Sequence, residues 1–203
     1  LTGHVVFSTL HTNNAAGAIP RLTELGVDPS ILPSALRVVM AQRLVRKLCE
    51  KCKNKVSLKD PFKKKVEAVL AEITDPKYFK DTADRDHVYE PVGCDECNGT
   101  GYKGRTGIYE AIIMDEKVEE IVKMGATERS LREGSRHQGI LTMQQDGVIK
   151  VLKGITSLPE LTRVVELEEL LSQETEEASA YEMPEDDYTA PLLSEKDGLD
   201  AVA

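Results

Sequence analysis

Apolar positions in the first 48 residues predict one strand followed by two helices. Residues 5–10, Val-Val-Phe-Ser-Thr-Leu, are a short run rich in β-branched and aromatic side chains, which is typical of a strand buried on both faces of a parallel sheet. Residues 15–25 are predicted as a helix that ends at Gly26, because glycine readily adopts the left-handed conformation of a helix end. Asp28 and Pro29 begin a second predicted helix, with proline in the tolerated first turn.

The second predicted helix runs to the first pair of cysteines. Its apolar residues recur every four positions, at Leu36, Met40, Leu44 and Leu48. This spacing places side chains on one face of a helix, with Arg43 elsewhere on its circumference. A strand followed by two helices is the order expected in the closing part of an α/β domain.

The middle of the chain is predicted to alternate short elements. Residues 62–73 have the apolar spacing of a short helix, and residues 78–87 form a charged loop. Residues 88–92 indicate a strand that returns to the second pair of cysteines. Residues 104–107, Gly-Arg-Thr-Gly, indicate a turn, and residues 108–114 indicate an apolar strand.

Helical signals dominate from residue 115 onward, and we predict a small helical subdomain over residues 111–171. The last helix has an apolar face made by Leu161, Val164, Val165 and Leu171. Helix boundaries are indicated by the caps Asp115 and Thr127, by a stop near Gly139, by the capping-box spacings Thr142-x-x-Gln145 and Ser157-x-x-Glu160, and by Gly154.

Charge is unevenly distributed along the chain. The formal net charge is −9, but residues 166–203 hold 13 acidic and one basic side chain, which leaves 25 basic and 22 acidic ones in the first 165 residues. An acidic segment with few aromatic residues buries too little apolar surface to order itself, so residues 172–203 are predicted to be disordered. The mildly basic remainder suits a phosphate-bearing ligand but falls short of the balance typical of nucleic-acid-binding proteins.

The termini and hydropathy add two expectations. No run of 18 apolar residues occurs, so no membrane span is predicted. The first residues, Leu-Thr-Gly-His, lead at once into the predicted strand without a methionine. We therefore expect the chain as given to begin inside a domain.

The four cysteines form two Cys-x-x-Cys pairs, Cys49 with Cys52 and Cys94 with Cys97. Two such pairs offer four thiolates, which is the ligand set of closed, tetrahedral zinc sites. Two disulfides or four buried thiols are the alternatives. Because four sulfur ligands leave no open position for water, the predicted zinc is structural and the chemistry must lie elsewhere.

Three blocks of the sequence resemble one family. Residues 2–13, Thr-Gly-His-Val-Val-Phe-Ser-Thr-Leu-His-Thr-Asn, are similar to the histidine box of the ATPases that power type II secretion and type IV pilus assembly. The likeness continues through Arg21-Leu22, Gly26-Val27 and residues 41–46, Ala-Gln-Arg-Leu-Val-Arg. It also includes both cysteine pairs and residues 99–110, which resemble the metal-knuckle block of the pilus-extension and secretion branch. In order and spacing it covers about residues 1–165.

Apart from the acidic tail (172–203), which has no counterpart in the family, the resemblance implies an α/β fold in three parts. These parts are the C-terminal half of a RecA-like P-loop ATPase domain (residues 1–48), a tetracysteine zinc-binding subdomain (49–110) and a helical C-terminal subdomain (111–171). It further implies homo-hexameric rings in the cytoplasm at the inner face of the bacterial cytoplasmic membrane, where ATP hydrolysis drives pilin assembly or secretion through a membrane platform protein and accessory proteins.

The chain departs from the family pattern in one respect. No Gly-x4-Gly-Lys-Ser/Thr occurs in the 203 residues, nor do the acidic strand ends that hold magnesium. In the family these motifs lie upstream, and phosphoryl transfer depends on the phosphate cradle that they supply. ATP with Mg²⁺ is therefore expected to bind with ligands from outside this chain, which is predicted to be inactive alone.

Four residues are candidates for nucleotide chemistry. His11 follows the predicted strand and is expected to reach the terminal phosphate or its attacking water. His4 lies seven residues earlier, roughly 23 Å along a strand, so it is expected to act at another surface such as a subunit contact. Arg43 and Arg21 resemble nucleotide-proximal positions of the family. The alternatives are core histidines and arginines on a solvated helix face.

A second function stays open at this point. The chain could be a stand-alone, non-catalytic zinc-stapled protein-binding module, because Cys94-x-x-Cys97-x-Gly99-x-Gly101 is also similar to one repeat of the zinc domain of DnaJ-type chaperones. That domain repeats its motif, which occurs once here. A retraction motor of the same superfamily is a third reading, but the metal knuckles favour extension and secretion. Nucleic acid is not expected as a partner, since interleaved aromatics and a basic stripe are missing.

Overall fold

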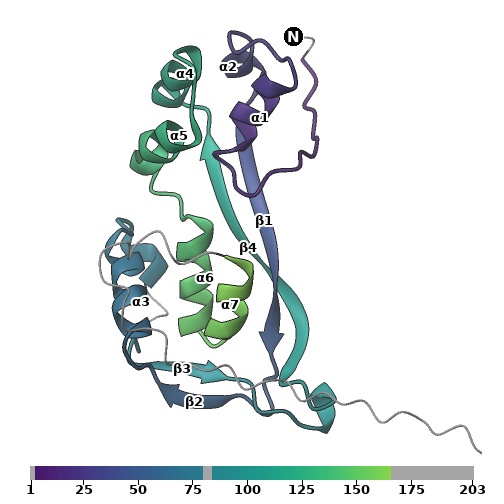
Figure 1. The fold of residues 1–203 in the computed structure, drawn as a ribbon, viewed down its shortest axis with the longest axis vertical. Helices are drawn as coiled ribbons and strands as arrows, with labels where there is room; N and C mark the ends of the chain where they lie inside the picture. Colours follow the sequence, from purple (N-terminus) through teal and green to yellow (C-terminus); the bar gives the residue numbers. More distant parts are fainter. Residues whose placement is uncertain (1–2, 80–83, 166–203) are drawn as a thin grey trace, which may run out of the picture. The chain divides into compact units, whose positions relative to one another are not determined.

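The computed structural model describes residues 3–79 and 84–165, which belong to one compact unit. It combines helices with two antiparallel two-stranded sheets, β1–β4 and β2–β3 (Figure 1). The predicted combination of helices and strands is thus confirmed, but both described sheets are antiparallel. The acidic tail and Leu171, for which predictions were made, lie outside the described residues.

The longest strands form a two-stranded ribbon. β1 (Val38–Leu48) pairs antiparallel with β4 (Tyr102–Ile113), so that Val38 lies opposite Ile113 at one end and Leu48 opposite Tyr102 at the other. Side chains alternate between the two faces of such a ribbon. The buried face carries Ala41, Val45, Ile108 and Ile112.

The helix predicted from Asp28 to the first cysteine pair is wrong. Only α2 (Leu32–Ala35) is helical, and residues 38–48 form β1. A four-residue spacing fits a helix, but four is also an even number, so it equally marks one face of a strand. Met40 and Leu44 lie on the exposed face, at 64% and 52% exposure, whereas Ala41 and Val45 face the core.

The strand predicted at residues 5–10 is also wrong for the described structure. These residues have no strand conformation, and Val5, Val6 and Phe7 are 80–94% exposed. A strand needs hydrogen-bonding neighbours, and among the described residues none pairs with this segment. The following helix is confirmed in a shorter form, as α1 (Ala18–Glu24), and Gly26 has the expected positive φ of 88°.

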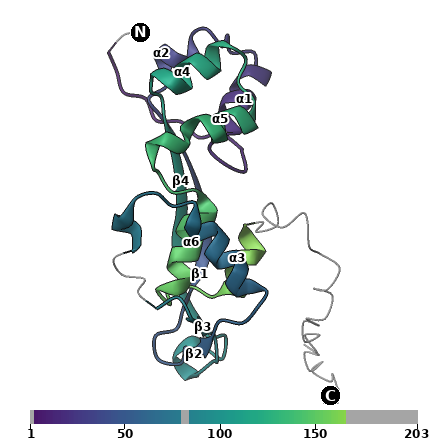
Figure 2. The ribbon, with the colours of Figure 1, turned by 90° about the vertical axis from the view of Figure 1, so that its left-hand side faces the viewer.

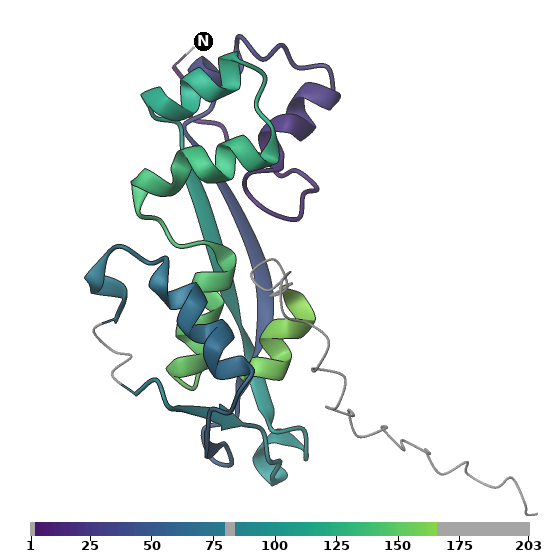
Figure 3. The same ribbon diagram turned by 60° about the vertical axis from the view of Figure 1, so that its left-hand side comes forward.

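Helices gather at two places along the ribbon (Figures 1–3). α4 (Glu116–Lys123) packs against α2 and against α5 (Glu128–Ser135), which is followed by the short 3₁₀ helix η3 (Arg136–Gln138). α6 (Met143–Leu152) packs on β4, and α7 (Leu158–Val164) packs on β1. α6 also contacts α3 (Phe62–Ala71) and α7.

The second sheet joins the two cysteine-bearing turns, residues 49–52 and 94–97, to the helices. We call these two turns the metal region. The sheet consists of β2 (Asn54–Ser57) and β3 (His87–Glu90), which confirms the predicted returning strand, and α6 packs against β3. α3 confirms the predicted short helix. Two further 3₁₀ helices, η1 (Pro76–Phe79) and η2 (Asp95–Cys97), lie in the connections.

The turn predicted at residues 104–107 is wrong, because both glycines lie inside β4. Gly104 has a φ of 79° and lies where the ribbon register shifts between Arg46 and Leu48. Gly107 leaves room for a ring, since a Cβ there would lie 2.4 Å from atoms of Tyr109. These glycines therefore serve an irregular strand and a close contact instead of a chain reversal.

The helix-capping predictions are confirmed. Asp115 accepts a hydrogen bond from the Val118 backbone N–H at 3.0 Å, and Thr142 forms a capping box with Gln145. Thr127 and Ser157 cap α5 and α7. In the Ser157 case, however, the Glu160 carboxylate does not complete the box.

Glu160 instead fastens α7 to β1. Its side chain is fully buried, and its two oxygens accept hydrogen bonds from the backbone N–H, Nε and Nη2 of Arg46 and from Arg163, at 2.7–3.2 Å. Burial alone would raise the pKa of Glu160, but hydrogen bonds from Arg163 and Arg46 outweigh it and lower the pKa to about 2.

Within residues 3–79 and 84–165, no helix has the length and apolar character that crossing a bilayer requires.

Candidate functional site

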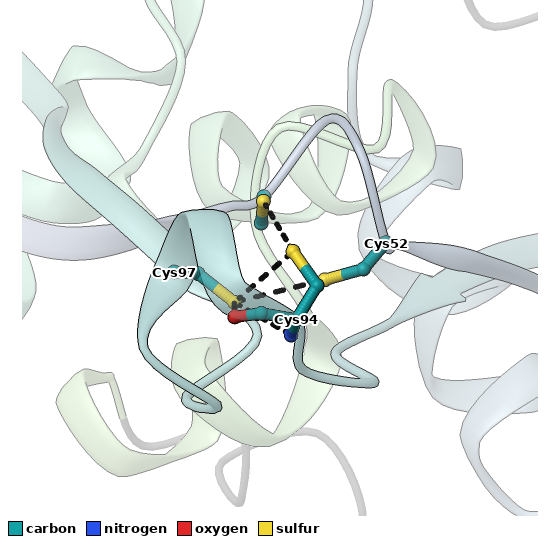
Figure 4. A group of neighbouring side chains, drawn as sticks. Cys52, Cys94 and Cys97 are labelled. Atoms are coloured by element: carbon teal, nitrogen blue, oxygen red, sulfur yellow. Dashed lines mark hydrogen bonds between the residues drawn. The ribbon is translucent and has the colours of Figure 1, made fainter.

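The two Cys-x-x-Cys turns meet in space, at the end of the ribbon where Leu48 pairs with Tyr102 (Figure 4). Their four sulfur atoms all lie within 4.8 Å of one another. The Sγ atoms of Cys49 and Cys94 are 3.9 Å apart, and Cys97 Sγ lies 3.8 Å from those of both Cys52 and Cys94. The structure thus brings together all four residues of the predicted metal site.

This spacing fits a tetrahedral metal ion. Four sulfurs about 2.3 Å from a central ion would be about 3.8 Å apart, which matches the shortest separations observed. The cysteines are not joined in disulfides, whose sulfurs would lie about 2.05 Å apart. The cluster could therefore hold a metal, as predicted.

Backbone N–H groups around the second cysteine pair stabilise a thiolate at Cys97. The backbone N–H groups of Cys94 and Gly101 both donate to Cys97 Sγ at 3.2 Å. Burial acts to raise the pKa of the Cys97 thiol, but these two donors outweigh it and lower the pKa to about 6. For Cys52, burial prevails and raises the pKa to about 11. A bound cation would favour the thiolate form of both.

Two glycines let the knuckle close. Gly101 has a φ of 72°, and a Cβ there would lie 2.4 Å from Cβ of Pro91. Gly93 has a φ of 104°, and a Cβ there would lie 2.5 Å from the carbonyl oxygen of Gly99. Any larger residue would push the backbone at residue 101 away from Pro91, or the backbone at residue 93 away from Gly99.

The metal region is attached to the C-terminal helices. Lys53 Nζ donates to the Gly154 carbonyl at 3.1 Å, and the Tyr102 hydroxyl lies 2.6 Å from Ser157 Oγ. The guanidinium of Arg46 stacks 4.2 Å from the centroid of the Tyr102 ring. The turn between α6 and α7 and the cysteine-bearing end of the ribbon thus form one hydrogen-bonded assembly.

The segment after His11 is held by three elements. Asn13 Oδ1 accepts from Arg43 Nη2 of β1 at 2.9 Å, and Asn14 Nδ2 donates to Glu128 of α5 at 2.6 Å. The backbone N–H of Ala15 donates to Glu110 of β4 at 2.5 Å. Asn14 Oδ1 also accepts from the backbone N–H of Gly17, the residue just before α1, at 2.7 Å. We call residues 11–15 the histidine segment.

The four candidate nucleotide residues are placed differently. His11 is exposed, and within the described residues no hydrogen bond or ion pair engages its ring, whereas Arg43 contacts the histidine segment through Asn13. His4 is exposed in the N-terminal stretch, and Arg21 forms an exposed ion pair with Glu24 on α1 at 2.8 Å. Among the described contacts, none joins His4 or Arg21 to the histidine segment.

A family comparison matches most of the chain. Residues 1–163 match the model of the family described as Type II/IV secretion system protein. The chain belongs to this family. This membership confirms the resemblance inferred from the histidine, arginine and cysteine blocks.

Named relatives come from both branches of this family. The chain is 40% identical over 167 residues to a type IV pilus assembly ATPase, PilB, of Thermus thermophilus, covering 82% of this chain and 18% of the relative. It is 42% identical over 164 residues to the type II secretion system protein E of Aeromonas hydrophila, covering 81% and 30%. It is 39% identical over 165 residues to the type II secretion system ATPase E of Vibrio cholerae, again covering 81% and 30%. The chain thus spans less than a third of the length of these relatives.

Sequence reasoning assigned no role to Glu110 and Glu128, and it expected Glu160 to complete a capping box. Glu110 and Glu128 hold the histidine segment, and Glu160 holds α7. One signal was available for Glu110, which lies between Ile108 and Ile112 on the core-facing side of an apolar strand. A carboxylate at such a position needs specific donors, because burying it without them is unfavourable.

Proposed function

We propose that this chain acts as the C-terminal part of an ATPase subunit that couples ATP binding and hydrolysis to type IV pilus assembly or type II protein secretion. The observation that carries the proposal is the family match over residues 1–163. Relatives about 40% identical over four-fifths of the chain are named as ATPases or components of these two machines.

The proposed fold is the C-terminal half of a RecA-like domain (residues 1–48), followed by a zinc-binding subdomain (49–110), a helical subdomain (111–171) and an acidic tail (172–203). The exposed apolar side chains of residues 5–7 support the first part. Exposed apolar side chains that lie together mark a contact surface, and further parts of a complete α/β domain would cover them.

His11 is proposed to act on the terminal phosphate of ATP or on its attacking water. In support, the ring of His11 is exposed while Asn13, Asn14 and Ala15 are held from β1, α5 and β4. Arg43 is proposed to lie close to the nucleotide, since it contacts the same segment. His4 is assigned to a subunit contact and Arg21 to the nucleotide vicinity.

ATP would bind with Mg²⁺, and the phosphate cradle and magnesium ligands would come from outside this chain. The sequence holds no Gly-x4-Gly-Lys-Ser/Thr, and phosphoryl transfer depends on such a cradle. We therefore propose that the 203 residues alone do not hydrolyse ATP.

The metal is proposed to be Zn²⁺, held by Cys49, Cys52, Cys94 and Cys97. Four sulfurs at tetrahedral spacing suit zinc and leave no coordination position for substrate. The ion would contribute to folding by joining the end of β1 to the start of β4, and the attached helices would gain a rigid base.

The assembly is proposed to be a homo-hexamer at the cytoplasmic face of the inner membrane, where it would act on a platform protein and accessory proteins. No nucleic acid is involved in this proposal. Closure of neighbouring subunits around nucleotide would supply the motion.

Steady-state ATP hydrolysis tests the catalytic proposal. In the complete subunit, His11→Ala should lower kcat by about a hundredfold if His11 acts on the reacting groups. His87→Ala removes a half-buried histidine of β3, whose ring lies 3.0 Å from the Asp84 carboxylate, and serves as the control, which should keep wild-type turnover. Unchanged turnover in His11→Ala would overturn the role of His11. A wild-type subunit that hydrolyses no Mg-ATP would instead favour the non-catalytic zinc-stapled binding module.

A further inference from the structure

One carboxylate joins two segments that are far apart in the sequence. Glu110 Oε1 accepts from the backbone N–H of Ala15 at 2.5 Å, and Glu110 Oε2 accepts from the backbone N–H of Met143 at 3.1 Å. Ala15 is the last residue of the histidine segment, and Met143 is the first residue of α6. A single side chain of β4 therefore bridges the histidine segment and a C-terminal helix.

The position of Glu110 makes this bridge specific. The residue is half-buried between Ile108 and Ile112, which are 0% and 6% exposed. A carboxylate in such surroundings is stable only when donors satisfy it. The N–H of Met143 belongs to the first turn of α6, where the helix dipole also favours negative charge.

The α6 side of the bridge is held in place by a reciprocal contact. Asp146 of α6 accepts from the backbone N–H of Tyr109 at 2.8 Å and from Lys150 at 2.5 Å. Neighbouring residues of β4 and α6 thus exchange carboxylate-to-amide hydrogen bonds. Because of this exchange, the first turn of α6 cannot shift along β4 without breaking both contacts.

The histidine side is equally constrained. Glu110 pairs in register with Ala41 of β1, two residues from Arg43, which donates to Asn13. Both strands of the ribbon therefore hold the segment that begins with His11, at Asn13 and at Ala15. A displacement of His11 must move these contacts or be opposed by them.

We propose that Glu110 is a positioning residue that couples the histidine segment to α6. Its carboxylate fixes the position of His11 relative to the β1–β4 ribbon. When the histidine segment moves, the two hydrogen bonds of Glu110 make the first turn of α6 move with it. The coupling itself is a property of this chain, whereas its effect on turnover rests on the ATPase function proposed above.

Glu110→Gln is the informative variant. The side chain keeps its length and one acceptor oxygen, so it can accept from only one of the two backbone amides. Its NH₂ group would face the other N–H, donor against donor. The link should therefore break while the strand and its packing persist, which far-ultraviolet circular dichroism and a heat-unfolding curve would verify.

Hydrogen exchange of single amides on the 203-residue chain, followed by NMR, tests the coupling without any need for ATP hydrolysis. Glu110→Gln should speed exchange of the Ala15 amide, the Met143 amide or both by about tenfold. The exposed Glu67→Gln of α3 is the matched control and should change neither. Wild-type exchange rates at both amides in Glu110→Gln would overturn the proposal.

A second substitution tests whether a change in α6 reaches the histidine segment through Glu110. Thr142→Ala removes the cap of α6 and should speed exchange at Ala15 in the wild-type background through the bridge. In the Glu110→Gln background the same substitution should leave Ala15 unchanged, since the connection is already broken. An effect of Thr142→Ala on Ala15 that persists in Glu110→Gln would overturn Glu110 as the link.

Turnover of the complete subunit separates this proposal from the proposed function. Glu110→Gln should lower kcat about tenfold and leave KM for ATP unchanged, because the positioning of His11 changes and nucleotide binding does not. If the exchange results hold but the wild-type subunit hydrolyses no ATP, the coupling stands and the proposed function falls. If the wild type is active and Glu110→Gln has wild-type kcat, the positioning role is refuted.

Discussion

Glu160 offers the sharpest test of how the C-terminal helices are attached. Its buried carboxylate accepts from Arg46 on β1 and from Arg163 on its own helix. Glu160→Gln keeps the shape of the side chain but removes its charge. The two arginines would then face an amide whose nitrogen can only donate.

The expected loss follows from the pKa. The pKa of Glu160 is about 2 in the folded protein, compared with an ordinary value of 4.5. A depression of this size corresponds to about 3 kcal/mol of folding stability at pH 7. Breaking buried ion pairs by removing one partner gives losses of about 3–5 kcal/mol, which agrees.

The pH dependence has a defined sign. Because folding lowers the pKa, the contribution is complete above about pH 5 and disappears as pH falls through about 2. By the same relation, it should be about 1.4 kcal/mol at pH 3. The difference in stability between wild type and Glu160→Gln should therefore shrink on acidification.

Urea unfolding followed by circular dichroism at pH 7 and pH 3 measures this difference. Glu133→Gln is the matched control, since its ion pair with Arg129 is exposed and should contribute less than about 0.5 kcal/mol. Equal losses in Glu133→Gln and Glu160→Gln would refute the reasoning. A Glu160→Gln loss that is the same at both pH values would also refute it.

Two further predictions concern the metal region. Gly101→Ala should destabilise the chain by more than about 2 kcal/mol in thermal unfolding, because it adds a clash with Pro91 to the strain of a positive φ. Gly99→Ala, which shares the positive φ but meets open space, should lose only about 1 kcal/mol, and equal losses would contradict the clash. Displacing the metal with a thiol-reactive mercurial should release about one Zn²⁺ per chain to a colorimetric chelator. Zinc retained in full by Cys97→Ser would count against the four-sulfur site.

Sequence patterns predicted those helices whose first turn is marked by a capping side chain. Asp115, Thr127, Thr142 and Ser157 cap helices as expected, because a cap depends on residues three positions apart. The two cysteine pairs also lie together as predicted, because a tetrahedral site needs four ligands and each pair supplies only two.

The errors lie where long-range pairing decides the structure. Residues 38–48 form a strand because β4 lies beside them, and their four-residue apolar spacing cannot distinguish a strand from a helix. β-Branched Val38, Val39 and Val45 were the available hint. Residues 5–10 have strand composition but no strand neighbour among the described residues.

The candidate site was predicted only in part for a similar reason. His11 and Arg43 were chosen by resemblance, and the contact of Arg43 with Asn13 crosses 30 positions of the sequence. The bridge through Glu110 crosses 95 positions to Ala15 and 33 to Met143. No local pattern encodes such pairs, so they become visible only in the folded chain.

Genetic complementation tests the central claim most directly. In the organism that encodes this chain, the gene would be deleted and restored with wild type, His11→Ala or His87→Ala, with subunit amounts matched by immunoblot. Surface pilin and secreted protein would then be quantified. The account predicts that wild type and His87→Ala restore one of these outputs and that His11→Ala restores neither. Full restoration by His11→Ala, or a deletion that alters neither output, would contradict it.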